Sequence, residues 1–136
     1  MGKSAQHWLV CLPRQDMEHC IEIGTFGLNR KYVLGQVEKG DDIICCASKD
    51  WKLIAKGSIT EPYYISDEPI FLAEGMFPDR VNFQATKVPS RSEVDLKQFL
   101  DKLDFVQNLA YWAVYFRNAV VKLSDHDWDL LQDQLK

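Results

Sequence analysis

The sequence predicts an α+β fold in which a small mixed β-barrel of five to six strands is flanked by helices. Two observations predict this class. Short segments rich in β-branched and aromatic residues are bounded by turn-forming residues, as in small all-β cores. Helical periodicity is found towards the two ends of the chain. Because 136 residues is the length of one ordinary domain, residues 1–136 are expected to form a single unit, with residues 1–6 as a flexible N-terminal segment.

The first half of the chain contains two strongly apolar runs. Residues 7–12 (HWLVCL) and 42–47 (DIICCA) are typical of buried strands. Asp16 is the expected N-cap of a helix that ends at about Ile23. Residues 24–27 follow this helix and are expected to form a glycine-containing loop.

The second half begins with a third strand over residues 52–60, in which Gly57 marks an expected bulge. Residues 61–69 read as irregular, and residues 80–88 form a fourth strand. Residues 94–103 have apolar side chains at helical spacing and are expected to form a helix.

The end of the chain is expected to add one more strand and one more helix. Residues 109–116 are aromatic-rich and fit a helix or a strand, whereas residues 119–123 form a short strand. Ser124 is the expected N-cap of a final helix over residues 125–135.

Composition limits the class of function. The net charge is −4, so the chain is not a protein held on nucleic acid by bulk positive charge. The four cysteines lack zinc-site spacing and are expected to be reduced, buried thiols. No membrane span or signal peptide is recognisable, which indicates an intracellular protein without a membrane partner.

No catalytic motif is present, so we expect a protein that is not an enzyme and that uses no metal or cofactor. The histidines His7, His19 and His126 are far apart in the sequence and are expected to be structural. One alternative stays open at this point, a Cys–His dyad such as Cys20 with His19 or His7.

The order of several short motifs resembles one family. These motifs are His7-Trp8-Leu9-Val10-Cys11 with Pro13-Arg14-Gln15, Phe26-Gly27-Leu28, Val37-x-x-Gly40-Asp41, Gly57-x-Ile59-Thr60 with Tyr63, Met76-Phe77-Pro78-Asp79-Arg80-Val81, Trp112 to Phe116, and Asp127-Trp128. As an ordered set over residues 7–135 they resemble the EVE domain family. The resemblance implies a PUA-like barrel related to YTH and ASCH domains.

The resemblance also implies a function. Relatives of this kind hold a flipped or single-stranded base in a pocket, and read modified cytosine in DNA or, in YTH domains, methylated adenine in RNA through an aromatic cage. We therefore expect a non-catalytic reader of a modified nucleobase, such as 5-methylcytosine, in DNA or RNA. A separate effector protein is a possible further partner.

Candidate site residues follow from these motifs and from the chemistry of base binding. The expected base-binding pocket contains two aromatic walls, loop backbone, a polar group and an exposed tryptophan, namely Phe26, Phe77, Gly27, Leu28, Arg14 and Trp51. The expected phosphate-contacting rim contains the cations Arg30, Lys31, Lys49, Arg80 and Arg117. The sequence departs from the family at Leu12 and Pro13, where many relatives have polar residues, and both presumed walls are Phe rather than Trp.

Two other functions stay open. The acidic net charge favours a small-molecule sensor that takes a nucleotide or metabolite in the same pocket. A small nuclease or hydrolase subunit is the third hypothesis, against which the lack of paired catalytic groups counts. The site residues also have structural explanations that do not involve a ligand. Phe26 and Phe77 would then be core residues, and Arg80 and Arg117 would each form a structural ion pair.

Overall fold

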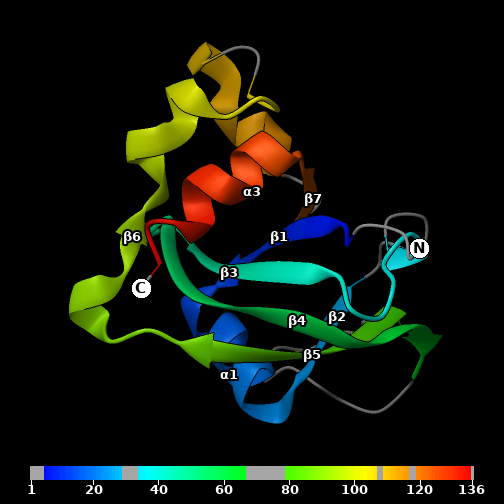
Figure 1. The fold of residues 1–136 in the computed structure, drawn as a ribbon. Coiled ribbons are helices and arrows are strands. Elements are labelled where there is room, and N and C mark those ends of the chain that lie inside the picture. The colour runs from blue at the N-terminus through cyan, green and yellow to red at the C-terminus, as the bar shows by residue number, and fades with distance from the viewer. Residues whose placement is uncertain (1–4, 29–33, 67–78, 107–108, 117–118, 136) are drawn as a thin grey trace.

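The computed structural model describes residues 5–28, 34–66, 79–106, 109–116 and 119–135. The strands are β1 (His7–Pro13), β2 (Thr25–Leu28), β3 (Asp42–Ser48), β4 (Lys52–Ile65), β5 (Asp79–Lys87), β6 (Val94–Asp95) and β7 (Val120–Leu123). The helices are α1 (Arg14–Ile23), α3 (Asp125–Gln132) and the 3₁₀ helices η1 (Ser90–Ser92), η2 (Leu96–Lys102) and η3 (Leu109–Phe116). The strands form one curved sheet in the order β2–β5–β4–β3–β1–β7, and β6 pairs with β4 (Figure 1).

The parallel strands β1 and β3 lie at the centre of the fold. Their register pairs Leu9 with Ile44 and Cys11 with Cys46. Both strands are uninterrupted apolar runs, and five consecutive residues of each are buried. Such runs are typical of strands that are covered on both faces. The two predicted central strands are therefore confirmed.

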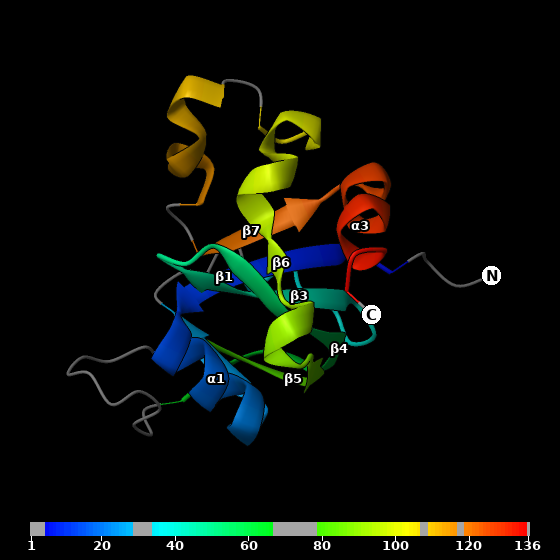
Figure 2. The ribbon, with the colours of Figure 1, turned by 90° about the vertical axis from the view of Figure 1, so that its left-hand side faces the viewer.

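The two faces of the sheet belong to separate hydrophobic clusters. The first cluster packs against α1 and includes Trp8, Val10, Met17, Cys20, Phe26, Ile43, Cys45, Ile54, Val81 and Phe83. The second packs against η2 and α3 and includes Leu9, Cys11, Ile44, Cys46, Leu53, Leu96, Leu100, Leu131 and Leu135. Figures 1 and 2 show α1 on one side of the sheet and α3 on the other. Side chains that alternate along each strand thus stabilise two layers of helices.

Helix α1 begins earlier than predicted. Its N-cap is Pro13, not Asp16, and Asp16 lies in the first turn, where its charge suits the helix dipole. Proline at this place has φ −51°, and no side chain caps the helix. The helix ends at Gly24, which has φ +75° and whose N–H donates to the carbonyl of Cys20.

The sheet is larger than the sequence indicated, although the α+β class is confirmed. Among the described residues it has seven strands rather than five to six, and its end strands β2 and β7 do not pair, so the predicted barrel is not closed. Strand β2 occupies part of the predicted loop, and β4 continues to Ile65 instead of ending at Thr60. The predicted bulge at Gly57 is wrong, because Gly57 pairs regularly with Ile43 and Ala85.

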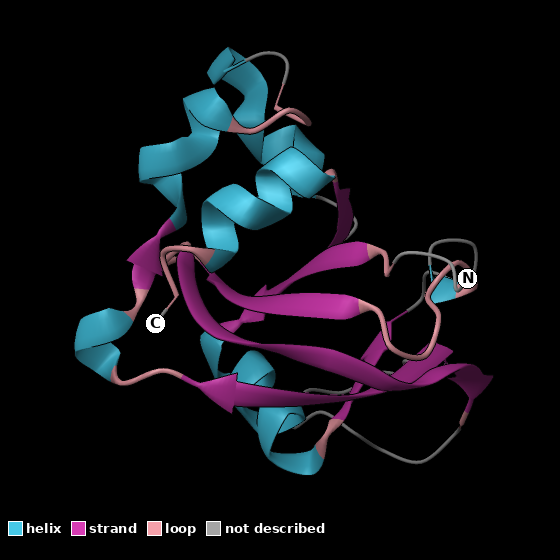
Figure 3. Cartoon of the chain, viewed as in Figure 1, coloured by secondary structure: helices cyan, strands magenta, loops and turns pink. Residues whose placement is uncertain are grey.

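The prediction of a helix over residues 94–103 is only partly correct. Val94 and Asp95 form β6, because they pair with Leu53 and Lys52 of β4, and η2 begins after them. The Asp95 carboxylate accepts the N–H of Lys97 and caps this 3₁₀ helix. The apolar spacing still places the predicted residues against the second cluster. Figure 3 shows the helices, in cyan, on both sides of the strands, in magenta.

The predicted start of the last helix is confirmed. The Ser124 hydroxyl accepts the N–H of Asp127 and caps the helix. Helix α3 begins at Asp125 and ends at Gln132 rather than at Leu135. Residues 109–116, which the sequence left ambiguous, form η3. Within the part of the chain that the structure describes, no helix is long and apolar enough to cross a bilayer.

Two polar clusters join the first strand to its neighbours. The buried Asp41 carboxylate accepts the Trp8 indole N–H at 2.9 Å, the Glu38 N–H at 2.8 Å and both the backbone N–H and the side-chain amide of Gln6 at 3.0 and 2.9 Å. Gln6 is thereby tied to the fold, although it falls in the segment 1–6 that the sequence predicted to be flexible. Residues 1–4 lie outside the described residues.

His7 is a structural residue, as expected. Its Nδ1 lies 2.8 Å from Asp42 at the start of β3, and its Nε2 lies 2.8 Å from Asp125 in the first turn of α3. The imidazole also stacks on Trp128, with ring centroids 5.0 Å apart. His7 therefore links β1 to both β3 and α3.

Candidate nucleic-acid interface

The predicted pocket residues fall into two groups that lie at opposite ends of α1. Phe26, Gly27 and Leu28 form β2 beyond the C-terminal end of the helix, whereas Arg14 is its first residue. A helix rises about 1.5 Å per residue, so the ten residues of α1 separate the two ends by about 15 Å. The structure therefore does not bring all six predicted residues into one pocket.

The first group lies where β2 pairs with β5. Phe26 is opposite Val81, Gly27 is opposite Arg80, and Leu28 is opposite Asp79. The ring of Phe26 is only 1% exposed and packs against Phe83, with ring centroids 5.5 Å apart. In this structure it forms part of the first cluster beneath the surface, rather than a wall open to solvent.

The predicted rim is only partly visible in the structure. Arg80 is 5% exposed and its side chain is buried in the sheet, whereas Lys49 is exposed in the turn between β3 and β4. Four predicted residues lie outside the described ranges and stay predictions: Phe77, Arg30, Lys31 and Arg117.

The second group surrounds the turn between β3 and β4. Arg14 donates two hydrogen bonds to Glu93, at 2.9 and 3.1 Å, and one to Asp50 at 2.8 Å. These hydrogen bonds, first those to Glu93, raise the pKa of the Arg14 guanidinium above its usual range. Arg14 thus stabilises this turn through structural ion pairs with Asp50 and Glu93.

Trp51 has a similar structural role in this turn. Its ring packs edge-on against Trp112, with centroids 5.0 Å apart, and its carbonyl accepts the N–H of Leu96. Its backbone φ is +55° and that of Lys49 is +73°, both in the left-handed region that non-glycine residues seldom adopt. The contacts of Trp51 and Arg14 hold this turn in place.

A polar strip that the sequence did not indicate lies beside the first group. The hydroxyls of Thr25 in β2 and Tyr64 in β4 both donate to the Asn82 amide oxygen in β5, each at 2.7 Å. The neighbouring Tyr63 donates to Asp79 at 2.8 Å, and this hydrogen bond raises the pKa of the Tyr63 phenol. Thr25 and Asn82 alternate with Phe26 and Val81 along β2 and β5, so the hydrogen bonds of Thr25 and Tyr64 to Asn82 lie on the face of this end of the sheet opposite Phe26.

Tyr64 is the best-placed exposed aromatic in this strip. Its ring is 36% exposed, the next residue Ile65 is 69% exposed, and Tyr64 pairs with Arg80 across β5. The hydrogen bond to Asn82 fixes the direction of the ring. An exposed ring held on a sheet surface is a platform on which a nucleobase can stack. The two consecutive tyrosines after Pro62 were the available sequence signal.

The burial of the four cysteines does not favour nucleophilic chemistry. All four are buried and free of disulfides. Desolvation by burial raises the pKa of the Cys20 thiol to about 12 and also raises the pKa values of Cys11 and Cys45. Because the thiolate is the reactive form, this burial argues against the Cys20–histidine dyad.

The raised thiol pKa values predict lower stability in alkali. An unfolded thiol loses its proton at about pH 8.5, whereas folded Cys20 keeps it up to about pH 12, so the stabilisation present below pH 8.5 is lost as the pH rises between these values. Urea unfolding at increasing pH should show a falling free energy of unfolding from about pH 8.5 upwards. A thiol reagent should label the native protein slowly and the urea-unfolded protein rapidly at all four cysteines. Rapid labelling of one native cysteine would contradict this assignment.

Comparison with known proteins supports the fold. No family model matches the chain. A UPF0310 protein of Mycobacterium avium (strain 104) is 29% identical over 146 residues, which cover 95% of this chain and 96% of that protein. A hypothetical protein from Leishmania major has 11% identity and a TM-score of 0.67, with 96% of this chain and 95% of that chain covered.

YTH domains are also among the similar structures. The Mmi1 YTH domain has 7% identity and a TM-score of 0.67, with 99% of this chain and 77% of that chain covered. The same domain, solved in complex with RNA, has a TM-score of 0.66. The chain therefore shares the fold of a YTH domain, to which the sequence predicted a relationship, and the narrower EVE assignment stays a prediction.

Proposed function

We propose that this protein is a non-catalytic reader of a modified nucleobase in RNA or DNA, and that it presents the bound strand to a separate effector. The observation that carries the proposal is the shared fold with the Mmi1 YTH domain, which has been solved in complex with RNA. The match covers 96% of this chain, so the whole domain and not one motif is similar. The buried thiols are consistent with binding rather than with nucleophilic chemistry.

The proposed site is the end of the sheet formed by β2, β5 and β4. Phe26 belongs to the buried apolar layer behind this site, and Phe77, which the family resemblance makes an aromatic wall, would stack on the base. β2 is the last strand of the sheet path, so its outer edge pairs with no strand among the described residues. The backbone groups of Gly27 and Leu28 on that edge are suited to bonding the polar edge of a base.

Tyr64 extends this site along the nucleic-acid strand. Its partly exposed ring is held by Asn82 on the face of the sheet opposite Phe26, so a strand that passes over this end of the sheet can stack a neighbouring base on it. One such stacking contact contributes roughly 1–3 kcal/mol without selecting a base. The pocket then supplies specificity and Tyr64 supplies affinity.

Charge should contribute little to this binding. Two cations, Arg14 and Lys87, are already paired with carboxylates, and the net charge is −4. Binding through few phosphates has a shallow dependence on salt, because each neutralised phosphate of a single strand adds about 0.7 to the slope. The same acidity favours the alternative of a small-molecule sensor, which would gain nothing from flanking phosphates.

The site is tested by truncating its two proposed stacking residues. Phe77→Ala and Tyr64→Ala should each weaken binding of a modified single-stranded oligonucleotide about tenfold, as expected for one lost stacking contact. Tyr64→Phe keeps the ring and should retain most of the affinity. Phe99→Ala, on the opposite cluster, is the matched control and should bind as the unmodified protein does once folding is verified.

The proposed location is wrong if both site variants fold and bind with unchanged affinity. Equal binding of a free modified nucleoside and of the oligonucleotide would instead favour the small-molecule sensor. Measuring both ligands at two salt concentrations separates these results.

A further inference from the structure

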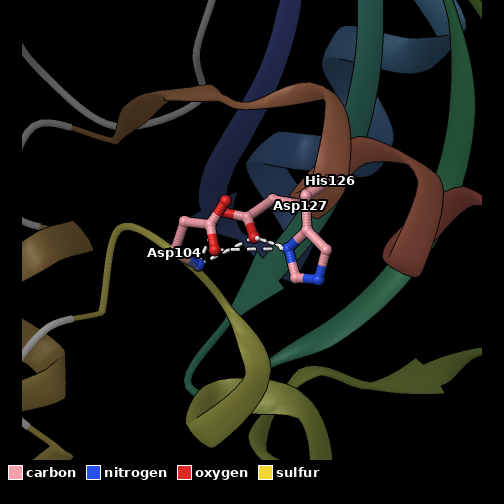
Figure 4. Close-up of side chains that lie close together, drawn as sticks. All are labelled: Asp104, His126 and Asp127. Atoms are coloured by element: carbon pink, nitrogen blue, oxygen red, sulfur yellow. Dashed lines mark hydrogen bonds and ion pairs between the residues drawn. The ribbon is translucent and has the colours of Figure 1, made fainter.

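Three metal-ligating side chains converge at the start of α3, away from the proposed base site. They are Asp104, which follows η2, and His126 and Asp127 in the first turn of α3 (Figure 4). The Nδ1 atom of His126 lies 3.1 Å from Oδ1 of Asp127 and 3.3 Å from Oδ1 of Asp104. One ligand atom from each residue lies within 4.8 Å of the other two. The imidazole nitrogen distinguishes this group from an ordinary acidic helix start.

Groups outside the three ligand atoms hold both carboxylates in position. Asp127 is fully buried, and its carboxylate accepts the backbone N–H of Asp104 at 2.7 Å and, more weakly, that of Phe105 at 3.4 Å. The other oxygen of Asp104, Oδ2, accepts the Ser124 hydroxyl at 2.8 Å. Hydrogen bonds of this kind orient ligands around protein-bound metals. Oδ1 of each aspartate lies next to the imidazole nitrogen, and Oδ1 of Asp127 also accepts the Asp104 N–H.

The imidazole nitrogen of His126 faces more acceptors than it has hydrogens to give. A single ring nitrogen can offer one hydrogen, yet it faces two carboxylate oxygens, and the two carboxylates repel each other. A cation between the three atoms would be bound by both charges and by the nitrogen lone pair. The side chains of His126 and Asp104 are 60% and 57% exposed, so an ion and a water ligand can reach the group from solvent.

We propose that Asp104, His126 and Asp127 bind one divalent transition-metal ion of the zinc type. A tetrahedral site with bonds of about 2.0–2.1 Å places neighbouring ligand atoms about 3.3–3.4 Å apart. The two nitrogen–oxygen distances of 3.1 and 3.3 Å are close to that spacing. One imidazole with two carboxylates suits zinc, whereas calcium and magnesium prefer oxygen ligands alone. Water completes the coordination.

The ion would have a structural role. It would join the segment after η2 to α3, and both elements cover the second cluster rather than the face that holds Phe26. This inference therefore does not depend on the proposed base reading, and the two can fail separately. A metal bound only to the folded state raises the stability of the protein.

Titration of the intact, metal-free protein with Zn²⁺ and Co²⁺ tests the site. Calorimetry should show one bound ion, and His126→Gln and Asp104→Asn should each weaken binding at least tenfold. Both altered residues are more than half exposed, so the variants are expected to fold. His19→Gln, which removes a histidine of α1, is the matched control and should bind as the unmodified protein does. Bound Co²⁺ should show the visible bands of a tetrahedral nitrogen–oxygen site.

Three results would overturn the proposal. The first is the absence of stoichiometric binding by the folded protein. The second is equal affinity of the His126→Gln variant and the unmodified protein. The third is a near-ultraviolet thiolate-to-cobalt band, which would place the ion on the cysteines.

Discussion

Replacing Asp41 by alanine is expected to lower the free energy of unfolding by about 3–5 kcal/mol. The Asp41 carboxylate is 2% exposed and accepts four hydrogen bonds, from Trp8, Glu38 and two groups of Gln6. Alanine would leave the buried indole N–H and nearby backbone N–H groups without acceptors, and each such group costs roughly 1–3 kcal/mol. Urea unfolding monitored by tryptophan fluorescence measures the loss.

The neighbouring carboxylate provides the control for this prediction. Asp42 is partly exposed and its side chain pairs with His7. Removing its charge with Asp42→Asn should therefore cost at most about 1 kcal/mol, as for other partly exposed polar contacts. If Asp41→Ala and Asp42→Asn lowered the free energy of unfolding by similar amounts, the hydrogen bonds of Asp41 would not stabilise the fold as proposed.

Replacing Gly57 by alanine is expected to have an effect of similar size for a purely steric reason. A Cβ atom on Gly57 would lie 1.8 Å from the carbonyl oxygen of Gln84 and 2.6 Å from the Cα of Ala85. Both are backbone atoms of β5, so strands β4 and β5 would have to separate. We expect a loss of roughly 3–5 kcal/mol, above the usual 1–3 kcal/mol for overpacking.

Gly40 is the matched control for Gly57. It has φ +92°, and nothing lies within 4 Å of a Cβ built there. Gly40→Ala should therefore cost only the conformational strain of about 1–2 kcal/mol. Thermal unfolding of the two variants compares them directly, and an equal shift of the midpoint would contradict the steric account.

The sequence was most informative where local pattern and tertiary position agree. The apolar runs of β1 and β3 and the Ser124 cap of α3 were all predicted correctly. Strand β2 was missed because TFGL lies next to glycines that favour a loop, and only its pairing with β5 makes it a strand. Val94 and Asp95 were assigned to a helix for the converse reason, since pairing with β4 overrides their helical pattern.

The candidate site was harder to predict because it depends on distances across the fold. Sequence spacing could not show that α1 places Arg14 and Phe26 at opposite ends, or that Arg14 is paired with Glu93. Tyr64 was missed because β4 was expected to end at Thr60, and its contact with Asn82 joins residues of different strands.

The residues that stabilise the fold are largely different from those proposed to bind the ligand. The fold depends on the apolar strands β1 and β3 and on the Asp41 hydrogen bonds. The proposed site depends on the end of the sheet where Phe26, Gly27 and Tyr64 lie. Variants at that end should therefore change binding more than stability.

The most direct test of the central claim is a fluorescence anisotropy titration with matched oligonucleotides. The set contains plain, 5-methylcytosine, 5-hydroxymethylcytosine and N6-methyladenine versions of one sequence, as single strands and duplexes, at two salt concentrations. A base reader should prefer one modification at least tenfold, which corresponds to about 1.4 kcal/mol of discrimination, and should keep that preference at higher salt. Equal affinity for plain and modified strands, or no binding to any of them, would contradict the account.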